Sequence, residues 1–167
     1  MVLTLGADDL RSIKWYIDAS YAVHPDFKSH TGTAMTMGLG APIANSSKQK
    51  INTRSSTEAE LVGGDDGITI ILWTRLFLEA QGIEIKDNIL YQDNKSAILL
   101  EGNGRKSAGK QSRALNVRYF FLTDQVERGR VSIQYCPTDA MIADYMTKPL
   151  QGVKFIHFRK AIMGLPD

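Results

Sequence analysis

The feature that most constrains the fold is Lys14–Tyr21, an extended stretch with an aspartate near its middle. Its β-branched and aromatic residues predict a strand, in which Trp15 and Ile17 lie on one face and Asp18 lies on the other. A buried carboxylate without a partner is costly, so an aspartate in such a strand needs a cation, a metal ion or a dense set of hydrogen bonds. Asp18 is therefore either a metal ligand or a structural residue with satisfied hydrogen bonds.

The order of the expected elements predicts an α/β fold. Three strands with short connections come first, and strands alternate with helices after them, which is typical of a mixed sheet with an antiparallel start and helices on its faces. The expected strands are Lys14–Tyr21, His30–Met37, Ile43–Lys50, Asn88–Asp93 and Val131–Cys136. The expected helices are a long one from the Ser55–Thr57 caps to Ala80, one that starts over Asn94–Leu100, and then Asn116–Arg128, Asp139–Met146 and Val153–Met163.

Length and composition indicate a single globular domain. The 167 residues suffice for one ordinary core and not for two, so residues 1–167 are assigned to one domain, with a loosely held leader at 1–11 and a C-terminal helical tail at 150–167. The lone Cys136 excludes an internal disulfide and fits a reducing compartment. No apolar run approaches the roughly 18 residues that a membrane span requires.

Positive charge is concentrated late in the chain. The segment 105–130 holds seven Lys or Arg residues and two acids, whereas the whole chain has a net charge of +2. Such a stretch indicates either contacts with phosphate groups or a solvated helix face.

Four acids stand out by their positions. Asp18 lies within the first strand and Glu60 in the first turns of the long helix. Asp93 lies at the carboxyl end of the fourth strand, where open α/β sheets tend to place their sites, and Asp144 lies in the short helix after the fifth strand. Their convergence from separate elements would make a carboxylate site.

Glu60 is preferred to Glu58 because of its helical phase. The two side chains differ by about 200° around the helix axis, so they cannot share a face. Gly63, Gly64 and Gly67 follow on the Glu60 side, while Glu58 fits a capping box with Ser55. The glycines either let a ligand or another backbone approach, or serve helix–sheet packing alone.

Several carboxylates together suit hard divalent cations. Mg²⁺ prefers oxygen ligands and keeps part of its water shell, and two such ions about 4 Å apart support phosphodiester cleavage. Zinc is disfavoured, because His24, His30 and His157 lie in no ligand spacing and there is one cysteine.

Taken together, these stretches resemble the RNase H domain of copia-type LTR retrotransposon Pol polyproteins. The resemblance covers nearly the whole chain, and the pair STEAEL and ADYMTKPL is its most specific part. The matching segments are Lys14–Gly32, Lys48–Leu61, Ile89–Ile98, Asn116–Phe121 and Tyr135–Gly152.

The resemblance implies an RNase H-like fold, a five-stranded mixed sheet whose first three strands are antiparallel and which is flanked by helices. It implies a metal-dependent endoribonuclease that cuts the RNA strand of RNA/DNA hybrids during reverse transcription and leaves 3′-hydroxyl and 5′-phosphate ends. The family's catalytic and metal-binding acids carry over onto Asp18, Glu60, Asp93 and Asp144, with two Mg²⁺ ions, or Mn²⁺ in their place. Asp18 would bridge both ions, Glu60 and Asp93 would complete one shell, and Asp144 the other.

The resemblance also implies a setting. The expected partners are an RNA/DNA hybrid and an upstream reverse transcriptase of the same polyprotein, with no membrane. The isolated domain is expected to be a monomer, and its location a cytoplasmic virus-like particle or the nucleus.

Substrate contacts are assigned as a group, because hybrids are recognised through phosphates, sugars and shape. The hydroxyl and amide candidates could equally be caps and turn residues. The expected substrate-binding residues are Ser20, Arg54, Ser56, Asn94, Lys95, Arg113 and Arg118.

Two departures from related patterns are visible. Ala114 stands where copia-type sequences usually have a histidine, which puts substrate affinity in question more than chemistry. The loop Pro137–Asp139 lacks the histidine found in many cellular RNases H.

Two other functions compete. One is a non-catalytic nucleic-acid-binding or polymerase-supporting module that keeps the fold, against which the presence of all four acids argues. The other is a DNA strand-transfer enzyme of the wider superfamily, which would be expected to carry a late glutamate where this chain has Asp144.

Overall fold

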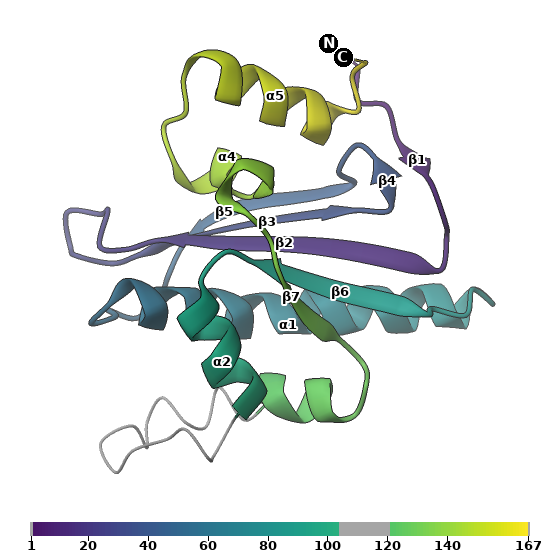
Figure 1. Cartoon of the computed structure of the whole chain (residues 1–167), viewed down its shortest axis with the longest axis horizontal. Coiled ribbons are helices and arrows are strands. Elements are labelled where there is room, and N and C mark those ends of the chain that lie inside the picture. Colours follow the sequence, from purple (N-terminus) through teal and green to yellow (C-terminus); the bar gives the residue numbers. More distant parts are fainter. Residues whose placement is uncertain (1, 104–120, 167) are drawn as a thin grey trace.

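A five-stranded mixed sheet forms the centre of the molecule (Figure 1). The structure is a computed structural model and describes residues 2–103 and 121–166. The strands lie in the order β5-β3-β2-β6-β7. Their bounds are β2 Ser12–Ser20, β3 His30–Thr36, β5 Ile43–Lys48, β6 Asp87–Gln92 and β7 Ser132–Tyr135. β2, β3 and β5 are antiparallel neighbours, and β6 and β7 run parallel to β2, which confirms the predicted fold class.

The central strand β2 has the alternation expected from its sequence. Ile13, Trp15 and Ile17 are fully buried and belong to the main hydrophobic core. Asp18 lies directly opposite Gly32 of β3 in the antiparallel register. The aspartate therefore sits in the middle of the sheet and not at an exposed edge.

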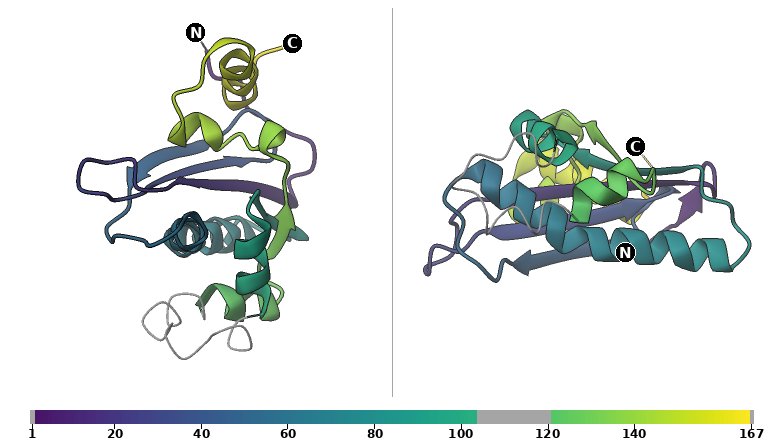
Figure 2. Two further views of the ribbon diagram at one scale, coloured as in Figure 1. Left: turned by 60° about the vertical axis from the view of Figure 1, so that its left-hand side comes forward. Right: turned by 90° about the horizontal axis from the view of Figure 1, so that it is seen from below.

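One long helix covers one face of this sheet. α1 (Ser56–Ala80) is capped by Ser55, whose hydroxyl accepts a hydrogen bond from the Glu58 backbone N–H at 3.1 Å. The Glu58 carboxylate in turn accepts from the Arg54 backbone N–H at 2.5 Å, one residue before the Ser55 N–H that a capping box uses. Figure 2 shows α1 end-on beneath the sheet in its left-hand view. α2 (Lys95–Asn103) and a helix over residues 121–127 lie on the same side.

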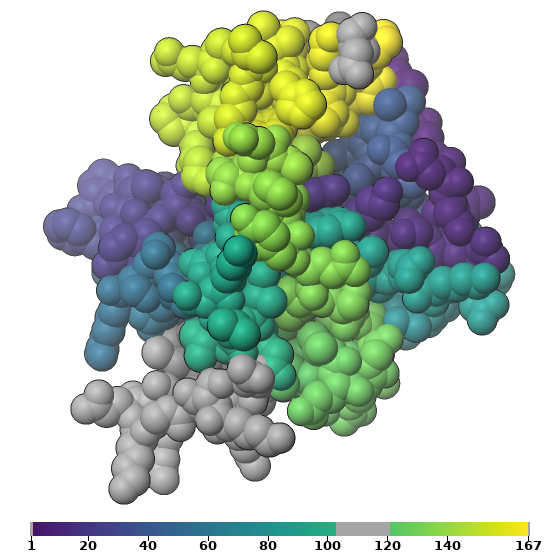
Figure 3. All heavy atoms as spheres, viewed as in Figure 1, coloured from purple at the N-terminus to yellow at the C-terminus, as the bar shows by residue number. Residues whose placement is uncertain are grey.

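The C-terminal elements cover the opposite face. They are a 3₁₀ turn, η2 (Thr138–Ala140), the one-turn helix α4 (Asp144–Thr147) and helix α5 (Gly152–Met163). In the space-filling view this segment forms the top of the molecule (Figure 3). A second hydrophobic cluster of Cys136, Met141 and Ala143 joins it to the sheet through Tyr16 and Tyr91, whose rings stack at 5.0 Å.

Two sequence predictions need correction here. The prediction of a single helix over Asp139–Met146 is wrong, because the segment divides into η2 and α4. Both Met141 and Ala143 are buried, and the bend between the two turns points both of them into the second cluster.

The prediction of a loosely held leader over residues 1–11 is also wrong for part of that range. Gly6–Ala7 (β1) pairs with Gly38–Leu39 (β4) in a small two-stranded sheet. The Thr4 N–H donates to the Met163 carbonyl at 2.9 Å, so the two ends of the chain lie together (Figure 1). The start of the predicted helix Asn116–Arg128 lies outside the described residues. Within the described part of the chain, no helix combines the length and apolarity needed to cross a membrane.

Candidate active site

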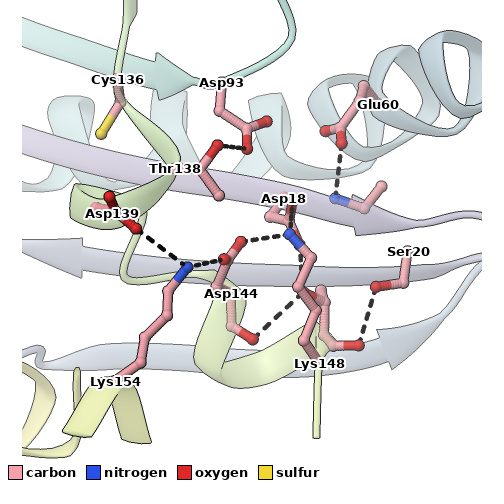
Figure 4. A network of polar contacts seen from close by, with 12 residues as sticks. Asp18, Ser20, Glu60, Asp93, Cys136, Thr138, Asp139, Asp144, Lys148 and Lys154 are labelled. Atoms are coloured by element: carbon pink, nitrogen blue, oxygen red, sulfur yellow. Dashed lines mark hydrogen bonds and ion pairs between the residues drawn. The ribbon is translucent and has the colours of Figure 1, made fainter. Parts of the chain in front are cut away.

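Three of the four predicted acids meet at one end of the central strands. Asp18, Glu60 and Asp93 each offer a carboxylate oxygen, and these oxygens lie within 4.8 Å of one another. They come from the middle of the sheet, the first turns of α1 and the end of β6 (Figure 4). Asp18 and Glu60 are buried and Asp93 is half-buried, so the cluster opens to solvent on the Asp93 side.

Glu60 is held against β2 with one oxygen left over. Its Oε1 accepts a hydrogen bond from the Ala19 backbone N–H at 3.2 Å. Its Oε2 is buried and has no hydrogen-bond partner among the described residues. Burial, followed by the nearby charge of Asp18, raises the pKa of Glu60 to about 9. In the absence of a cation this carboxyl is therefore neutral at pH 7, and a cation at Oε2 would favour its charged form.

Asp18 is held by the segment that follows it on the opposite face. The Thr147 hydroxyl donates to Asp18 Oδ2, and the Lys148 ammonium lies 3.3 Å from Oδ1. Burial raises the pKa of Asp18, and this outweighs the lowering by Thr147 and Lys148. The sequence left Asp18 as either a metal ligand or a structural residue with satisfied hydrogen bonds. The structural interpretation holds in part, because a lysine ammonium and a threonine hydroxyl lie beside the carboxylate.

Asp144 is fully buried and is placed differently from the other three. Lys148 Nζ lies 2.7 Å from its Oδ1, and Lys154 Nζ lies 3.1 Å from its Oδ2. Lys148 therefore bridges Asp144 and Asp18 (Figure 4). Asp144 is not one of the three acids whose oxygens converge within 4.8 Å.

A missing side chain on β3 brings α4 close to the sheet. A Cβ atom on Gly32 would lie 2.7 Å from Thr147 Cγ2 and 2.8 Å from both the Ala143 carbonyl oxygen and Met146 Cβ. The last carbonyls of α4 are bound by the sheet: Ser20 Oγ donates to the Thr147 carbonyl at 2.9 Å. These contacts fix Asp144 relative to Asp18.

The glycine face of α1 is explained by packing. A Cβ on Gly63 or Gly67 would meet Ile17 of β2, at 3.3 Å and 2.3 Å respectively. A Cβ on Gly64 would lie 2.8 Å from the buried Glu101 carboxylate of α2. These three glycines therefore allow close helix–sheet and helix–helix packing. They do not leave room for a ligand. The same close approach brings Glu60 to the Ala19 N–H.

Asp93 has a polar neighbour in the loop that the sequence singled out for lacking a histidine. The Thr138 hydroxyl in η2 donates to Asp93 Oδ2 at 3.1 Å. The contact joins the ends of two neighbouring strands, since Thr138 follows β7 and Asp93 follows β6.

The predicted substrate residues are scattered around this cluster. Asn94 Oδ1 caps α2 by accepting from the Ser96 and Ala97 N–H groups, and the Lys95 ammonium lies 4.8 Å from the centre of the Tyr135 ring. Arg54 and Ser56 are exposed at the start of α1, while Ser20 is bound to the Thr147 carbonyl. Substrate binding by these residues stays a prediction. Arg113, Arg118 and Ala114 lie outside the described residues.

Sequence reasoning missed Thr147, Lys148 and Lys154. The first two lie inside the ADYMTKPL stretch, and Lys148 follows Asp144 by four residues, the spacing that brings helical side chains together. That signal could have found Lys148. Nothing in the sequence indicates Lys154, which comes from α5.

Comparisons with known proteins agree with this fold. No protein-family model matches the chain. It is 31% identical over 161 residues to the retrovirus-related Pol polyprotein from transposon TNT 1-94 of Nicotiana tabacum, which covers 96% of the chain and 12% of the relative. It is 31% identical over 153 residues to that from transposon RE2 of Arabidopsis thaliana, with 90% and 10% covered. The chain thus spans about a tenth of the length of these relatives.

Solved structures extend the comparison to the fold. LC11-RNase H1, whose crystal structure is in complex with an RNA/DNA hybrid, matches with a TM-score of 0.53 and 12% identity over 78% of this chain and 88% of that one. The N-terminal RNase H domain of a Mycobacterium tuberculosis protein matches with a TM-score of 0.50 and 17% identity over 81% and 90%. The fold is that of RNase H domains. The chain's homologues are retrovirus-related Pol polyproteins of copia-type transposons, which confirms the resemblance read from the sequence.

Proposed function

We propose that this chain is a metal-dependent RNase H that hydrolyses the RNA strand of RNA/DNA hybrids by a two-metal mechanism. The observation that carries the proposal is the convergence of Asp18, Glu60 and Asp93, with a buried Glu60 oxygen that has no hydrogen-bond partner among the described residues. A buried polar atom of this kind is costly, and a cation at that position would remove the cost.

The donor set fits a hard divalent cation. All three convergent ligands are carboxylate oxygens, which suit Mg²⁺ or Mn²⁺, whereas neither a histidine nor a cysteine belongs to the cluster within the described residues. When bound, such ions activate water and stabilise the developing charge in phosphodiester hydrolysis. Asp18, Glu60 and Asp93 would hold one ion, and Asp18 with Asp144 a second.

The chain's own residues prepare this site. Thr147 and Lys148 fix the orientation of the Asp18 carboxylate, and Thr138 does the same for Asp93. The backbone N–H of Ala19 holds Glu60 towards the cluster. Because these contacts come from both faces of the sheet, the carboxylates are positioned before any substrate arrives.

The biological setting follows from the relatives and is proposed on that basis. The Pol polyproteins are about ten times longer than the matched region, which supports a reverse transcriptase elsewhere in the same polyprotein as partner. We place the activity in the cytoplasmic virus-like particle or the nucleus, where reverse-transcribed hybrids arise. The RNA/DNA hybrid bound by LC11-RNase H1 supports the same kind of substrate here.

A non-catalytic module is the second candidate. The observation in its favour is that Lys148 already bridges Asp18 and Asp144, so two of the four acids have a counter-charge without any metal. A module of this kind would bind hybrid and leave it intact.

The test is cleavage of a 5′-labelled RNA strand in an RNA/DNA hybrid with Mg²⁺ or Mn²⁺, beside single-stranded RNA and duplex DNA. Asp18→Asn and Asp93→Asn are compared with Asp87→Asn, a matched control at the other end of β6. We expect hybrid-only cutting that is lost in the first two variants and retained in the third. Hybrid binding without cutting by the wild type would favour the non-catalytic module.

A further inference from the structure

The second ion position of the proposed site is already filled by a side chain. Lys148 Nζ lies 3.3 Å from Asp18 Oδ1 and 2.7 Å from Asp144 Oδ1, so it contacts both carboxylates that would share the second metal. A cation shared by these two oxygens would need the space in which this nitrogen lies. Lys148 and a second divalent ion therefore exclude each other.

Charge balance supports the same conclusion. The four acids of the proposed site lie near two ammonium groups, those of Lys148 and Lys154, and Lys154 also lies 3.8 Å from the solvent-exposed Asp139. One divalent ion in the Asp18, Glu60 and Asp93 cluster, together with both lysines, neutralises all four carboxylates. A second divalent ion added without loss of an ammonium would leave the site with excess positive charge.

The two lysines differ in the carboxylates that they contact. Lys148 is the C-cap of α4 and contacts both Asp18 and Asp144, which are buried. The exposure of the two lysine side chains is similar, at 37% for Lys148 and 33% for Lys154. Lys154 contacts Asp144 Oδ2 and Asp139, lies over the Phe158 ring, and is not a partner of Asp18. Asp144 therefore keeps one ammonium when the other is displaced.

We propose that Lys148 is an internal counter-ion that occupies the second metal position, and that it must be displaced before a second divalent ion binds. The inference rests on the proposed two-metal site and adds an order of events to it. The first ion enters the three-acid cluster while Lys148 is in place, and the second ion exchanges with the Lys148 ammonium. Lys148 is thus a positioning residue for Asp18 and Asp144 in the one-metal state.

The test is a metal titration without nucleic acid. Mn²⁺ binding is followed by loss of the free-ion electron paramagnetic resonance signal, and Mg²⁺ binding by calorimetry. We expect the wild type to bind one ion more tightly than the second. In Lys148→Met the second ion should bind about tenfold more tightly or better, which corresponds to 1.4 kcal/mol, with the first ion changed less.

Three variants serve as controls. Lys148→Arg keeps a cation at the position and should retain weak second-ion binding. Lys154→Met should tighten second-ion binding less than Lys148→Met, because Lys154 does not contact Asp18. Lys160→Met removes a lysine of the same helix as Lys154 that is outside these ion pairs, and should behave as the wild type.

Two results would overturn the inference: second-ion affinity in Lys148→Met equal to that of the wild type, or an equal gain in Lys154→Met, which would reflect net charge alone. Should Lys148→Met not fold, as judged by its thermal transition, Lys148→Gln takes its place. The hybrid-cleavage assay is independent of this titration. Hybrid cleavage by the wild type, with second-ion affinity unchanged in Lys148→Met, would remove the inference and keep the proposed function. The expected change in second-ion affinity without hybrid cleavage would keep the displacement of Lys148 and remove the proposed nuclease function.

Discussion

Gly32 of β3 should be the glycine on which the site's geometry depends most. It is paired with Asp18 across the strands, and its missing side chain is what lets α4 lie against the sheet. In Gly32→Ala the new methyl carbon would lie 2.7–2.8 Å from Thr147 Cγ2, the Ala143 carbonyl oxygen and Met146 Cβ, where ordinary contact begins near 3.4 Å. α4 would have to move away by about 0.7 Å.

The expected cost is about 1–3 kcal/mol of unfolding free energy, the usual range for an extra carbon in a filled space. One of the three neighbours is a backbone oxygen, so rotation of a side chain cannot relieve the clash. The displacement also separates Thr147 and Lys148 from Asp18. The affinity for divalent ions at Asp18 and Asp144 should therefore change in the same variant that loses unfolding free energy.

Urea unfolding measures the effect, with the midpoint as the readout and the slope as a check on two-state behaviour. Gly63→Ala is the matched control, because its new carbon would meet Ile17 and Thr31 at 3.3–3.4 Å and its helix gains about 0.5–1 kcal/mol from losing a glycine. Its stability should stay within about 1 kcal/mol of the wild type. A Gly32→Ala protein that unfolds at the wild-type urea concentration would refute the argument for close approach of α4.

The remaining predictions concern buried groups. Burial raises the pKa of Glu60 to about 9 and that of Glu101 to about 8, from ordinary values of 4.5, so without metal the folded protein binds more protons and its stability should fall as pH rises from about 4.5 to 9. Urea unfolding across that range measures the slope, which Glu101→Gln should reduce. Thr147→Val should cost about 1.5–3 kcal/mol without metal, by loss of a hydrogen bond to a carboxylate, and less in saturating Mg²⁺. Leu90→Ala, fully buried in β6, should cost about 2–5 kcal/mol at any metal concentration.

Each of these has an outcome that would contradict it. Stability that rises between pH 5 and 8 without metal would mean that Glu60 and Glu101 are charged in the folded protein. A Thr147→Val cost that is the same with and without Mg²⁺ would mean that the hydroxyl supports the fold and not the Asp18 carboxylate. A Leu90→Ala protein as stable as the wild type would contradict the assignment of β6 to the core.

The sheet and the long helix could be predicted because their signals are local. β2 alternates Ile13, Trp15 and Ile17 with polar or aromatic neighbours, and the capping box at Ser55 and Glu58 marks the start of α1. The bend at Met141 could not be predicted in this way. It depends on Tyr16 and Tyr91, residues far away in the sequence, which form the other half of the second hydrophobic cluster.

The carboxylate cluster could be predicted in part because some of its signals are also local. Helical phase separates Glu60 from Glu58, and strand position identifies Asp18 and Asp93. Of the two lysines that hold Asp144, Lys154 depends on how α5 lies over the sheet, which is a tertiary property. Lys154 therefore has no signature in the sequence, although it lies 3.1 Å from a buried carboxylate.

The most direct test of the central claim is the Mg²⁺-dependent cleavage rate of the hybrid's RNA strand by Glu60→Gln, measured beside Glu58→Gln. The two glutamates are two residues apart on α1, but Glu60 joins the cluster with Asp18 and Asp93 whereas Glu58 caps the helix. Since Glu60 is neutral without metal, glutamine should leave the metal-free fold intact and remove only the charge that a cation requires. We predict loss of cleavage in Glu60→Gln and wild-type cleavage in Glu58→Gln. Wild-type cleavage by a folded Glu60→Gln protein would contradict the account.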